Sequence, residues 1–177
     1  QMCIRDRQNE EDIMIQETYI KITEKIRSTH YGERIIVFIN RLLTDIVYIS
    51  FLVLLVYLAL HRDKVMVKIV MVTGISFVLV SVIRHFINAE RPYTKYGFIP
   101  LVPKEKKGDS MPSRHVFSAF VIGMAFLHMN IVLGIIILII GCLMAVIRVI
   151  VGVHFPRDVI AGAVIGILSG IIGFYLI

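Results

Sequence analysis

The chain has 177 residues, of which 57% are hydrophobic and 18% are charged, and its mean hydropathy is +0.81. Soluble domains usually carry about 25% charged residues, so this composition excludes an ordinary soluble globule and predicts an integral membrane protein. The formal net charge is +6, but the basic residues fall in loops between apolar runs. An anionic lipid or an anionic substrate therefore suits the chain better than nucleic acid does.

At about 20 residues per span, the length allows about five or six helices and little else. We therefore expect an all-α fold, an integral membrane helical bundle of about five transmembrane helices plus an N-terminal amphipathic helix. An N-terminal polar segment and this helix occupy residues 1–32, and one transmembrane domain occupies residues 33–177. The first eleven residues lack the apolar segment of a cleavable signal peptide. Cys3 and Cys142 lie in a polar segment and an apolar run, which favours unpaired thiols over a disulfide or a metal site.

The N-terminal helix is predicted over residues 13–28, where one apolar stripe is formed by Ile15, Tyr19, Ile22 and Ile26. The other faces carry too many charges for the helix to span a membrane. It is either an interfacial or packing helix, or a lid or partner-binding element.

Five apolar runs follow, at residues 35–60, 65–83, 116–129, 131–147 and 158–177. The first is about 39 Å long at 1.5 Å per residue, so it makes one span with a protruding end. The third is short unless its helix begins near Ser113. In the last run, small residues recur at every fourth position and form a smooth ridge that permits close helix packing, namely Gly162, Gly166 and Gly170.

Two polar segments interrupt the bundle, at residues 84–115 and 148–157. With five spans, both emerge on one membrane face, and the turns near His61 and His128 lie on the other. The longer segment holds four of the five prolines. A long loop inside a compact fold is usually functional or disordered, so chemistry is expected on this face.

The longer polar segment also carries residues outside the motifs described below. Lys95 and the run Lys104 to Lys107 either form a solvated loop or recruit anionic headgroups. Tyr93 and Tyr96 either line an entrance or anchor the chain at the membrane interface.

Arg84 and Arg91 lie seven residues apart, directly ahead of Pro92. Two helical turns would bring both guanidinium groups onto one face if the second span continues, and Pro92 would end the helix there. Paired guanidinium groups suit a phosphate because each can donate two parallel hydrogen bonds. The alternative is that both residues merely flank a membrane span.

The segment Met111 to His115 stands directly ahead of the third apolar run. Pro112 and Ser113 suit a helix start, where free backbone N–H groups and the helix dipole attract an anion. His115 at such a position can deliver a proton, although this motif alone is weak.

The segment Arg148 to Asp158 places ionisable groups between two long apolar runs. His154 precedes Pro156, a residue favoured in the first turn of a helix, and Asp158 lies four residues after His154. A carboxylate at that spacing can accept a hydrogen bond from one imidazole nitrogen, so that the other presents its lone pair. A nucleophilic histidine needs this arrangement, although a structural role for the pair stays open.

Together, the three segments resemble the three-part signature of the type 2 phosphatidic acid phosphatase family. They read Arg84-x6-Arg91-Pro92, Pro112-Ser113-Arg114-His115 and Arg148-x5-His154-x3-Asp158. That family shares its site with vanadium haloperoxidases, and the resemblance covers about residues 65–170.

Three positions depart from the family pattern. Arg84 replaces a usual Lys, Arg114 replaces a Gly, and Ile147 replaces a Ser. None of these departures removes an acid, a base or a nucleophile.

The resemblance implies a role for each matched residue. His154 attacks phosphorus and forms a phosphohistidine, Asp158 orients it, and His115 protonates the leaving oxygen. The nonbridging oxygens would be held by Arg84, Arg91, Ser113, the Arg114 backbone and Arg148. Water then hydrolyses the intermediate. Neither a metal nor another cofactor is expected, since the guanidinium cluster supplies the positive charge.

The resemblance also implies that residues 33–177 form a membrane-embedded phosphatase acting on a lipid phosphate or diphosphate. Undecaprenyl diphosphate, phosphatidylglycerophosphate and phosphatidic acid all stay open, as does the oligomeric state. Two alternatives are a lipid phosphotransferase using the same site and a non-catalytic lipid-phosphate carrier.

Membrane orientation gives conflicting signals. Counting Lys and Arg in the loop at residues 84–115 favours a cytoplasmic active face, whereas bacterial members of the family generally place this site outside. We expect a multi-pass cell-membrane protein with an extracytoplasmic site, because phosphate binding accounts for several of those charges.

Overall fold

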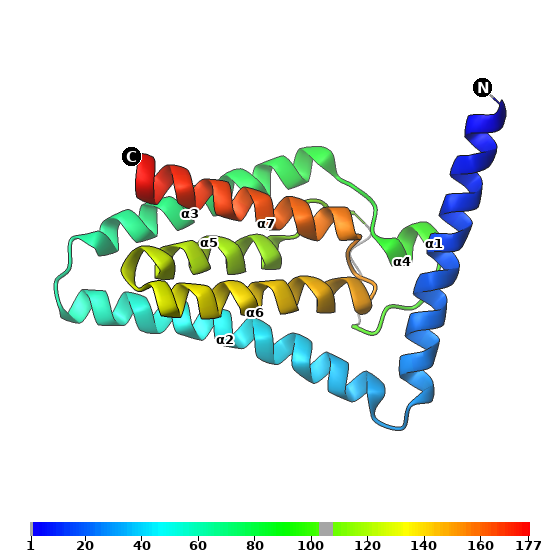
Figure 1. The fold of residues 1–177 in the computed structure, drawn as a ribbon, viewed down its shortest axis with the longest axis horizontal. Coiled ribbons are helices and arrows are strands. Elements are labelled where there is room, and N and C mark those ends of the chain that lie inside the picture. The colour runs from blue at the N-terminus through cyan, green and yellow to red at the C-terminus, as the bar shows by residue number, and fades with distance from the viewer. Residues whose placement is uncertain (1, 103–107) are drawn as a thin grey trace.

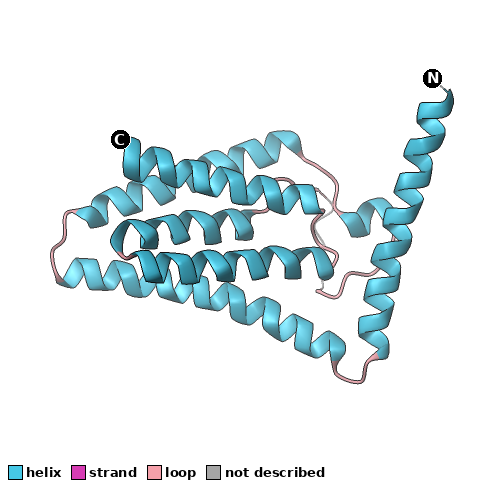
Figure 2. Ribbon diagram, in the orientation of Figure 1, coloured by secondary structure: helices cyan, strands magenta, loops and turns pink. Residues whose placement is uncertain are grey.

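The structure, a computed structural model, describes residues 2–102 and 108–177, without the side chains of residues 2–9 and 11. The Lys104 to Lys107 run and the Cys3 side chain lie outside this description. Seven α-helices and one π-helical turn occur in the described part: α1 Met2–Ser28, α2 Gly32–Leu60, α3 Val65–Ile87, α4 Pro92–Tyr96, α5 Arg114–Met129, α6 Ile131–Ile150, α7 Pro156–Ile171 and η1 Ile172–Leu176. The described residues contain no strand, so the predicted all-α class is confirmed (Figure 2).

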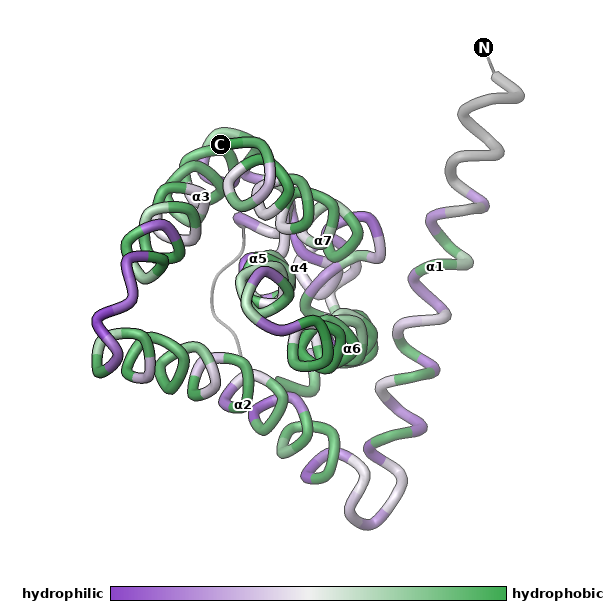
Figure 3. The backbone as a smooth tube through the Cα atoms, turned by 60° about the vertical axis from the view of Figure 1, so that its left-hand side comes forward, coloured by the Kyte–Doolittle hydropathy of each residue, from purple (hydrophilic) through white to green (hydrophobic). Residues whose placement is uncertain are grey.

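Among the described residues, four helical segments are long and apolar enough to cross a membrane: α2, the segment Val65–Tyr96 that contains α3, α6, and α7 with its π-helical end. The fifth apolar helix, α5, has 16 residues, or about 24 Å. It lies in the middle of the bundle with the longer helices around it (Figure 3). Most of its residues are buried, so α5 is a core helix whose length need not match the bilayer.

The glycine ridge of α7 packs against α5, as expected from its spacing. A Cβ atom added at Gly162 would lie 2.7 Å from the Ser113 carbonyl oxygen, and one at Gly166 would lie 2.8 Å from that of Phe117. Both neighbours are backbone atoms and cannot move aside easily. The ridge therefore brings the start of α7 close to the start of α5, where the predicted motifs lie.

The polar loops gather at one end of the bundle, and the turn after α2 and the hairpin between α5 and α6 gather at the other (Figure 1). The Asn130 side chain caps α6 by accepting hydrogen bonds from the Val132 and Leu133 N–H groups. The predicted motifs therefore share one end of the molecule.

Helix α1 begins earlier than predicted and crosses the loop end of the bundle at a steep angle to the other helices (Figure 1). Its predicted apolar stripe divides into two kinds of residue. Tyr19 is buried and Ile26 packs against the core, whereas Ile15 and Ile22 stay 42% and 37% exposed. The bundle covers only part of the apolar face of α1.

One sequence expectation about this end is wrong. The helix carrying Arg84 does not continue through Arg91, because α3 ends at Ile87 and Asn88 adopts a left-handed conformation with φ 40°. The Asn88 N–H group then closes the helix on the Arg84 carbonyl oxygen. Arg91 stands on extended backbone as the N-cap of α4, so the two arginines reach the site from different elements.

Candidate active site

Seven buried polar residues meet where α3, α5, α6 and α7 approach one another at the loop end: Arg84, Arg91, Ser110, Ser113, Arg148, His154 and Asp158. Each is at most 6% exposed. Buried charges are costly unless they are paired or bind a ligand, so this concentration makes this end of the bundle the candidate active site.

Two of the arginines tie the loops of the site together. Arg84, in the last turn of α3, donates from Nη1 to the Pro112 carbonyl oxygen at 2.9 Å. Arg91 donates from Nε to the Gly108 carbonyl oxygen at 3.1 Å and from Nη1 to that of Val153 at 3.3 Å. Arg91 thus joins the loop before α5 to the loop before α7.

Arg148 lies in the last turn of α6 and is 3% exposed. Its Nη2 donates to the Thr44 hydroxyl oxygen of α2 at 3.3 Å, and its buried Nε has no hydrogen-bond partner among the described residues. A fixed guanidinium group with a free donor is suited to binding an anion.

Helix α5 begins at Arg114, as the Pro-Ser pair predicted, with Ser113 as its N-cap. The Ser113 N–H donates to the Asp158 carbonyl oxygen at 2.9 Å, which joins α5 to α7. The buried Ser113 hydroxyl oxygen has no hydrogen-bond partner among the described residues. His115 is half-buried in the first turn, and the N–H groups of this turn offer an anion-binding end.

Arg114 occupies the position where the family usually has Gly. Its side chain is exposed, and its guanidinium carbon lies 6.0 Å from the centre of the Phe77 ring. The larger side chain is therefore accommodated outside the buried cluster.

His154 and Asp158 lie as the sequence predicted, at the start of α7, but a third residue stands between them. The Nδ1 atom of His154 is 3.7 Å from Asp158 Oδ2, too far for a direct hydrogen bond. The Ser110 hydroxyl lies 3.3 Å from His154 Nδ1 and donates to Asp158 Oδ2. The same carboxylate oxygen accepts from the Phe155 N–H at 3.0 Å. The expected direct contact is therefore replaced by a histidine–serine–aspartate chain.

Sequence reasoning missed Ser110. Its backbone N–H donates to the Ala89 carbonyl oxygen at 2.8 Å, which fixes the loop so that the hydroxyl reaches His154, 44 residues later. The available signal was a single serine shortly before Pro112 in a polar loop. Such a serine is common, so only the folded loop shows its place.

Burial lowers the pKa of His154 from its usual 6.5 to about 4, against the opposing effect of Asp158. The imidazole is therefore neutral at neutral pH. With Nδ1–H directed at the Ser110 oxygen, Nε2 carries the lone pair. The site thus combines a neutral, oriented histidine with fixed cationic groups and a second histidine at a helix start.

Comparison with known proteins gives a family match and a relative of similar sequence. Residues 65–177 match the family model described as the PAP2 superfamily. The chain is 29% identical over 136 residues to the undecaprenyl-diphosphatase BcrC of Bacillus subtilis, covering 75% of this chain and 70% of that protein.

Two solved structures are similar in fold. The crystal structure of Aquifex aeolicus LpxE has a TM-score of 0.68 and 27% identity, covering 89% of this chain and 92% of that one. A transmembrane PAP2-type phosphatidylglycerolphosphate phosphatase from Bacillus subtilis has a TM-score of 0.67 and 24% identity, covering 93% and 83%.

The family match takes in every residue of the three motifs, and the spanning helices agree with a multi-pass membrane protein. The resemblance seen in the sequence is confirmed: this chain belongs to the PAP2 superfamily.

Proposed function

We propose that this protein hydrolyses a lipid phosphate or diphosphate through a phosphohistidine formed on His154. The observation that carries the proposal is the His154–Ser110–Asp158 chain beside buried arginines at the start of α5. Unpartnered buried donors on Ser113 and Arg148 support it, because a phosphate group offers several acceptors to satisfy them.

In the first step, the Nε2 lone pair of His154 attacks phosphorus in line, and the bond from phosphorus to the leaving oxygen breaks. His115 donates a proton to that oxygen, which departs as a lipid alcohol or a lipid phosphate. The Nδ1–H stays on His154, hydrogen-bonded to Ser110, while Asp158 stabilises the positive charge on the phosphorylated ring.

In the second step, water attacks phosphorus, and His115, now neutral, accepts the water proton. The bond between phosphorus and His154 breaks, releasing inorganic phosphate and restoring both histidines. Arg84, Arg91, Arg148, Ser113 and the first-turn N–H groups of α5 stabilise charge on the nonbridging oxygens in both transition states.

The site requires no metal in this proposal, because guanidinium groups perform the charge stabilisation that Mg²⁺ performs in many phosphoryl-transfer enzymes. We expect phosphate release to continue in the presence of excess EDTA. An activity that is lost in EDTA and restored by Mg²⁺ would contradict this part of the proposal. The measurement is phosphate release by purified protein with and without chelator.

A lipid substrate suits a site at the end of a membrane bundle, since the headgroup can reach His154 while the hydrocarbon remains in the bilayer. The relative BcrC is named as an undecaprenyl-diphosphatase, so undecaprenyl diphosphate is the first substrate to test. Phosphatidylglycerophosphate and phosphatidic acid complete the panel.

The experiment measures phosphate release from this panel by the purified protein, with and without alcohol acceptors, and compares His154→Ala and His115→Ala variants. The proposal expects release without an acceptor and a loss of activity in both variants. Loss of the phosphoryl group from the lipid only when an alcohol is present, with the group recovered on that alcohol, would identify a phosphotransferase, and binding without cleavage would identify a carrier. Normal turnover by either variant would contradict the catalytic role proposed for that histidine.

A further inference from the structure

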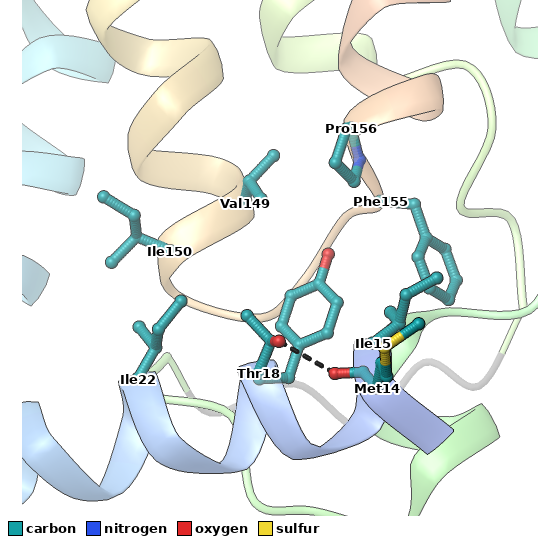
Figure 4. A pocket seen from close by; sticks show the side chains of 9 residues that line it. Met14, Ile15, Thr18, Ile22, Val149, Ile150, Phe155 and Pro156 are labelled. Carbon is teal, nitrogen blue, oxygen red and sulfur yellow. Dashed lines mark hydrogen bonds between the residues drawn. The ribbon is translucent and has the colours of Figure 1, made fainter. Parts of the chain in front are cut away.

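An apolar cavity of about 460 Å³ lies between α1 and the junction of α6 with α7. Figure 4 shows its two walls: Ile15 and Ile22 on α1 point toward Ile150 at the end of α6 and toward Phe155 and Pro156. Its size falls within the range of about 300–1,000 Å³ that is usual for ligand pockets.

The cavity shares a wall with the candidate active site. Phe155 directly follows His154, and Pro156 begins the helix that carries Asp158. From the other wall, the Tyr19 hydroxyl donates to the His154 carbonyl oxygen at 3.2 Å. A ligand in this cavity therefore lies against the segment that holds the nucleophile.

Polar contacts hold α1 in this position from its other side. Asp12 pairs with Lys95 at 2.8 Å and accepts from the Tyr96 hydroxyl at 3.1 Å. The Arg27 guanidinium donates to the Ile99 carbonyl oxygen at 3.1 Å. These contacts fix α1 to α4 and the following loop, so its apolar residues Ile15 and Ile22 need not pack against α6 to keep the helix in place.

A hydrocarbon chain is the ligand that this cavity suits. Its lining is apolar, and α1 carries too many charges to enter the bilayer, so the cavity lies where headgroups and hydrocarbon meet. A lipid phosphate with its phosphorus at His154 needs a place for its chain close to that residue. The cavity is an apolar space lined in part by Phe155 and Pro156, the two residues that follow His154.

We propose that this cavity binds the first part of the hydrocarbon chain of the lipid phosphate substrate and so positions its phosphorus. The inference rests on the proposed hydrolysis at His154. Because the bilayer is also apolar, transfer of the chain into the cavity gains little hydrophobic free energy. Its effect is geometric: contact on both sides of the chain fixes the distance between phosphorus and Nε2.

The test compares a long-chain substrate with one that has almost no chain, undecaprenyl diphosphate and methyl diphosphate, in the same detergent micelles. Ile22→Trp narrows the cavity, and we expect the ratio of kcat/KM for the long substrate to that for the short one to fall at least tenfold. Turnover of the short substrate reports that the variant is folded.

The matched control is Ile75→Trp, which places the same bulk in a second apolar cavity, of about 610 Å³, between α3 and the C-terminal end of the chain. This cavity has no residue of the three motifs in its wall, so Ile75→Trp should leave the ratio unchanged. An equal fall in Ile75→Trp, or an unchanged ratio in Ile22→Trp, would overturn the proposal. If the wild-type protein hydrolyses neither diphosphate nor any other lipid of the panel, the proposed function itself fails.

A binding measurement separates the substrate chain from ordinary membrane lipid. A lipid phosphate with a photoreactive diazirine on its chain should label α1, and excess undecaprenyl phosphate should suppress the labelling, whereas phosphatidylcholine should not. Equal suppression by phosphatidylcholine would show a site for bulk lipid and overturn the proposal. This readout does not depend on hydrolysis, so it distinguishes a failed chain site from a failed catalytic assignment.

Discussion

At the scale of single residues, Ser110 changes how the proposed nucleophile, His154, is positioned. Its hydroxyl bridges His154 Nδ1 and the Asp158 carboxylate, which lie 3.7 Å apart. Without the hydroxyl, the imidazole would lose the acceptor that fixes its tautomer and ring orientation. In the proposed mechanism, Ser110 acts through His154 and is therefore a positioning residue.

We expect Ser110→Ala to lower kcat by about ten- to a hundredfold, the range typical of removing a group that orients a metal-binding histidine. KM should change little, because no contact with substrate is assigned to Ser110. The matched control is Ser118→Ala, a buried serine of α5 outside the cluster, which should retain wild-type kcat. A rise in KM with unchanged kcat, or the same fall in kcat in both variants, would contradict the assignment.

The pH dependence of activity follows from the low pKa of His154. The imidazole must be neutral to attack phosphorus, and burial lowers its pKa from 6.5 to about 4. The acid limb of kcat/KM attributable to His154 should therefore lie near pH 4. A pH–rate profile measures this limb, and a limb near 6.5 assigned to His154 would show that the ring is solvated.

The same pKa shift predicts a change in stability. The unfolded chain binds a proton at His154 below pH 6.5 and the folded chain does not until about pH 4, so the free energy of unfolding falls as the pH drops through this window. His154→Gln should remove this part of the pH dependence.

At the scale of elements, the close packing of α7 on α5 positions the site. The start of α7 carries Asp158, and the start of α5 carries Ser113 and His115. Since a Cβ atom at Gly166 would lie 2.8 Å from the Phe117 carbonyl oxygen, a larger residue must push the two helices apart.

We expect Gly166→Ala to destabilise the protein by about 1–3 kcal/mol, the usual cost of overpacking, and to lower activity as Asp158 moves relative to Ser113. Thermal unfolding in detergent and phosphate release are the two measurements. The control is Gly74→Ala on α3, where an added Cβ meets no atom within 4 Å. Gly74→Ala should be neutral or slightly stabilising, because Ala favours a helix more than Gly does. Equal Tm values for the two variants would contradict the packing argument.

Helical periodicity and local motifs predicted much of this architecture. The five apolar runs, the helix start at Ser113 and the glycine ridge follow from spacing along the chain, and the structure contains each of them. The end of α3 was predicted too late, because Pro92 was taken as the residue that ends the helix. Asn88 ends it earlier, since Asn readily adopts the left-handed conformation of a helix end. Ser110 could not be predicted, because loop closure over many residues brings it to His154.

At the scale of the whole molecule, the site residues stand at one end of the bundle and the two short connections at the other (Figure 1). The rule that cytoplasmic loops are rich in Lys and Arg does not apply directly to the basic residues at the site end. Arg84, Arg91 and Arg148 are buried in the candidate phosphate site, and so they are not free cations in a loop. Discounting Arg84 and Arg91 weakens the argument for a cytoplasmic site, since it removes two of the seven basic residues in the loop at residues 84–115.

We therefore expect the site end to face the extracytoplasmic side, where the resemblance to bacterial family members also places it. With both native cysteines replaced by Ser, Glu90→Cys marks the site end and Arg62→Cys marks the turn between α2 and α3, and both positions are exposed. A membrane-impermeant maleimide added to intact cells should label the cysteine at position 90, and the cysteine at position 62 only after the membrane is permeabilised. The reverse pattern would place the site in the cytoplasm, and phosphate release by each variant confirms that the labelled protein is folded.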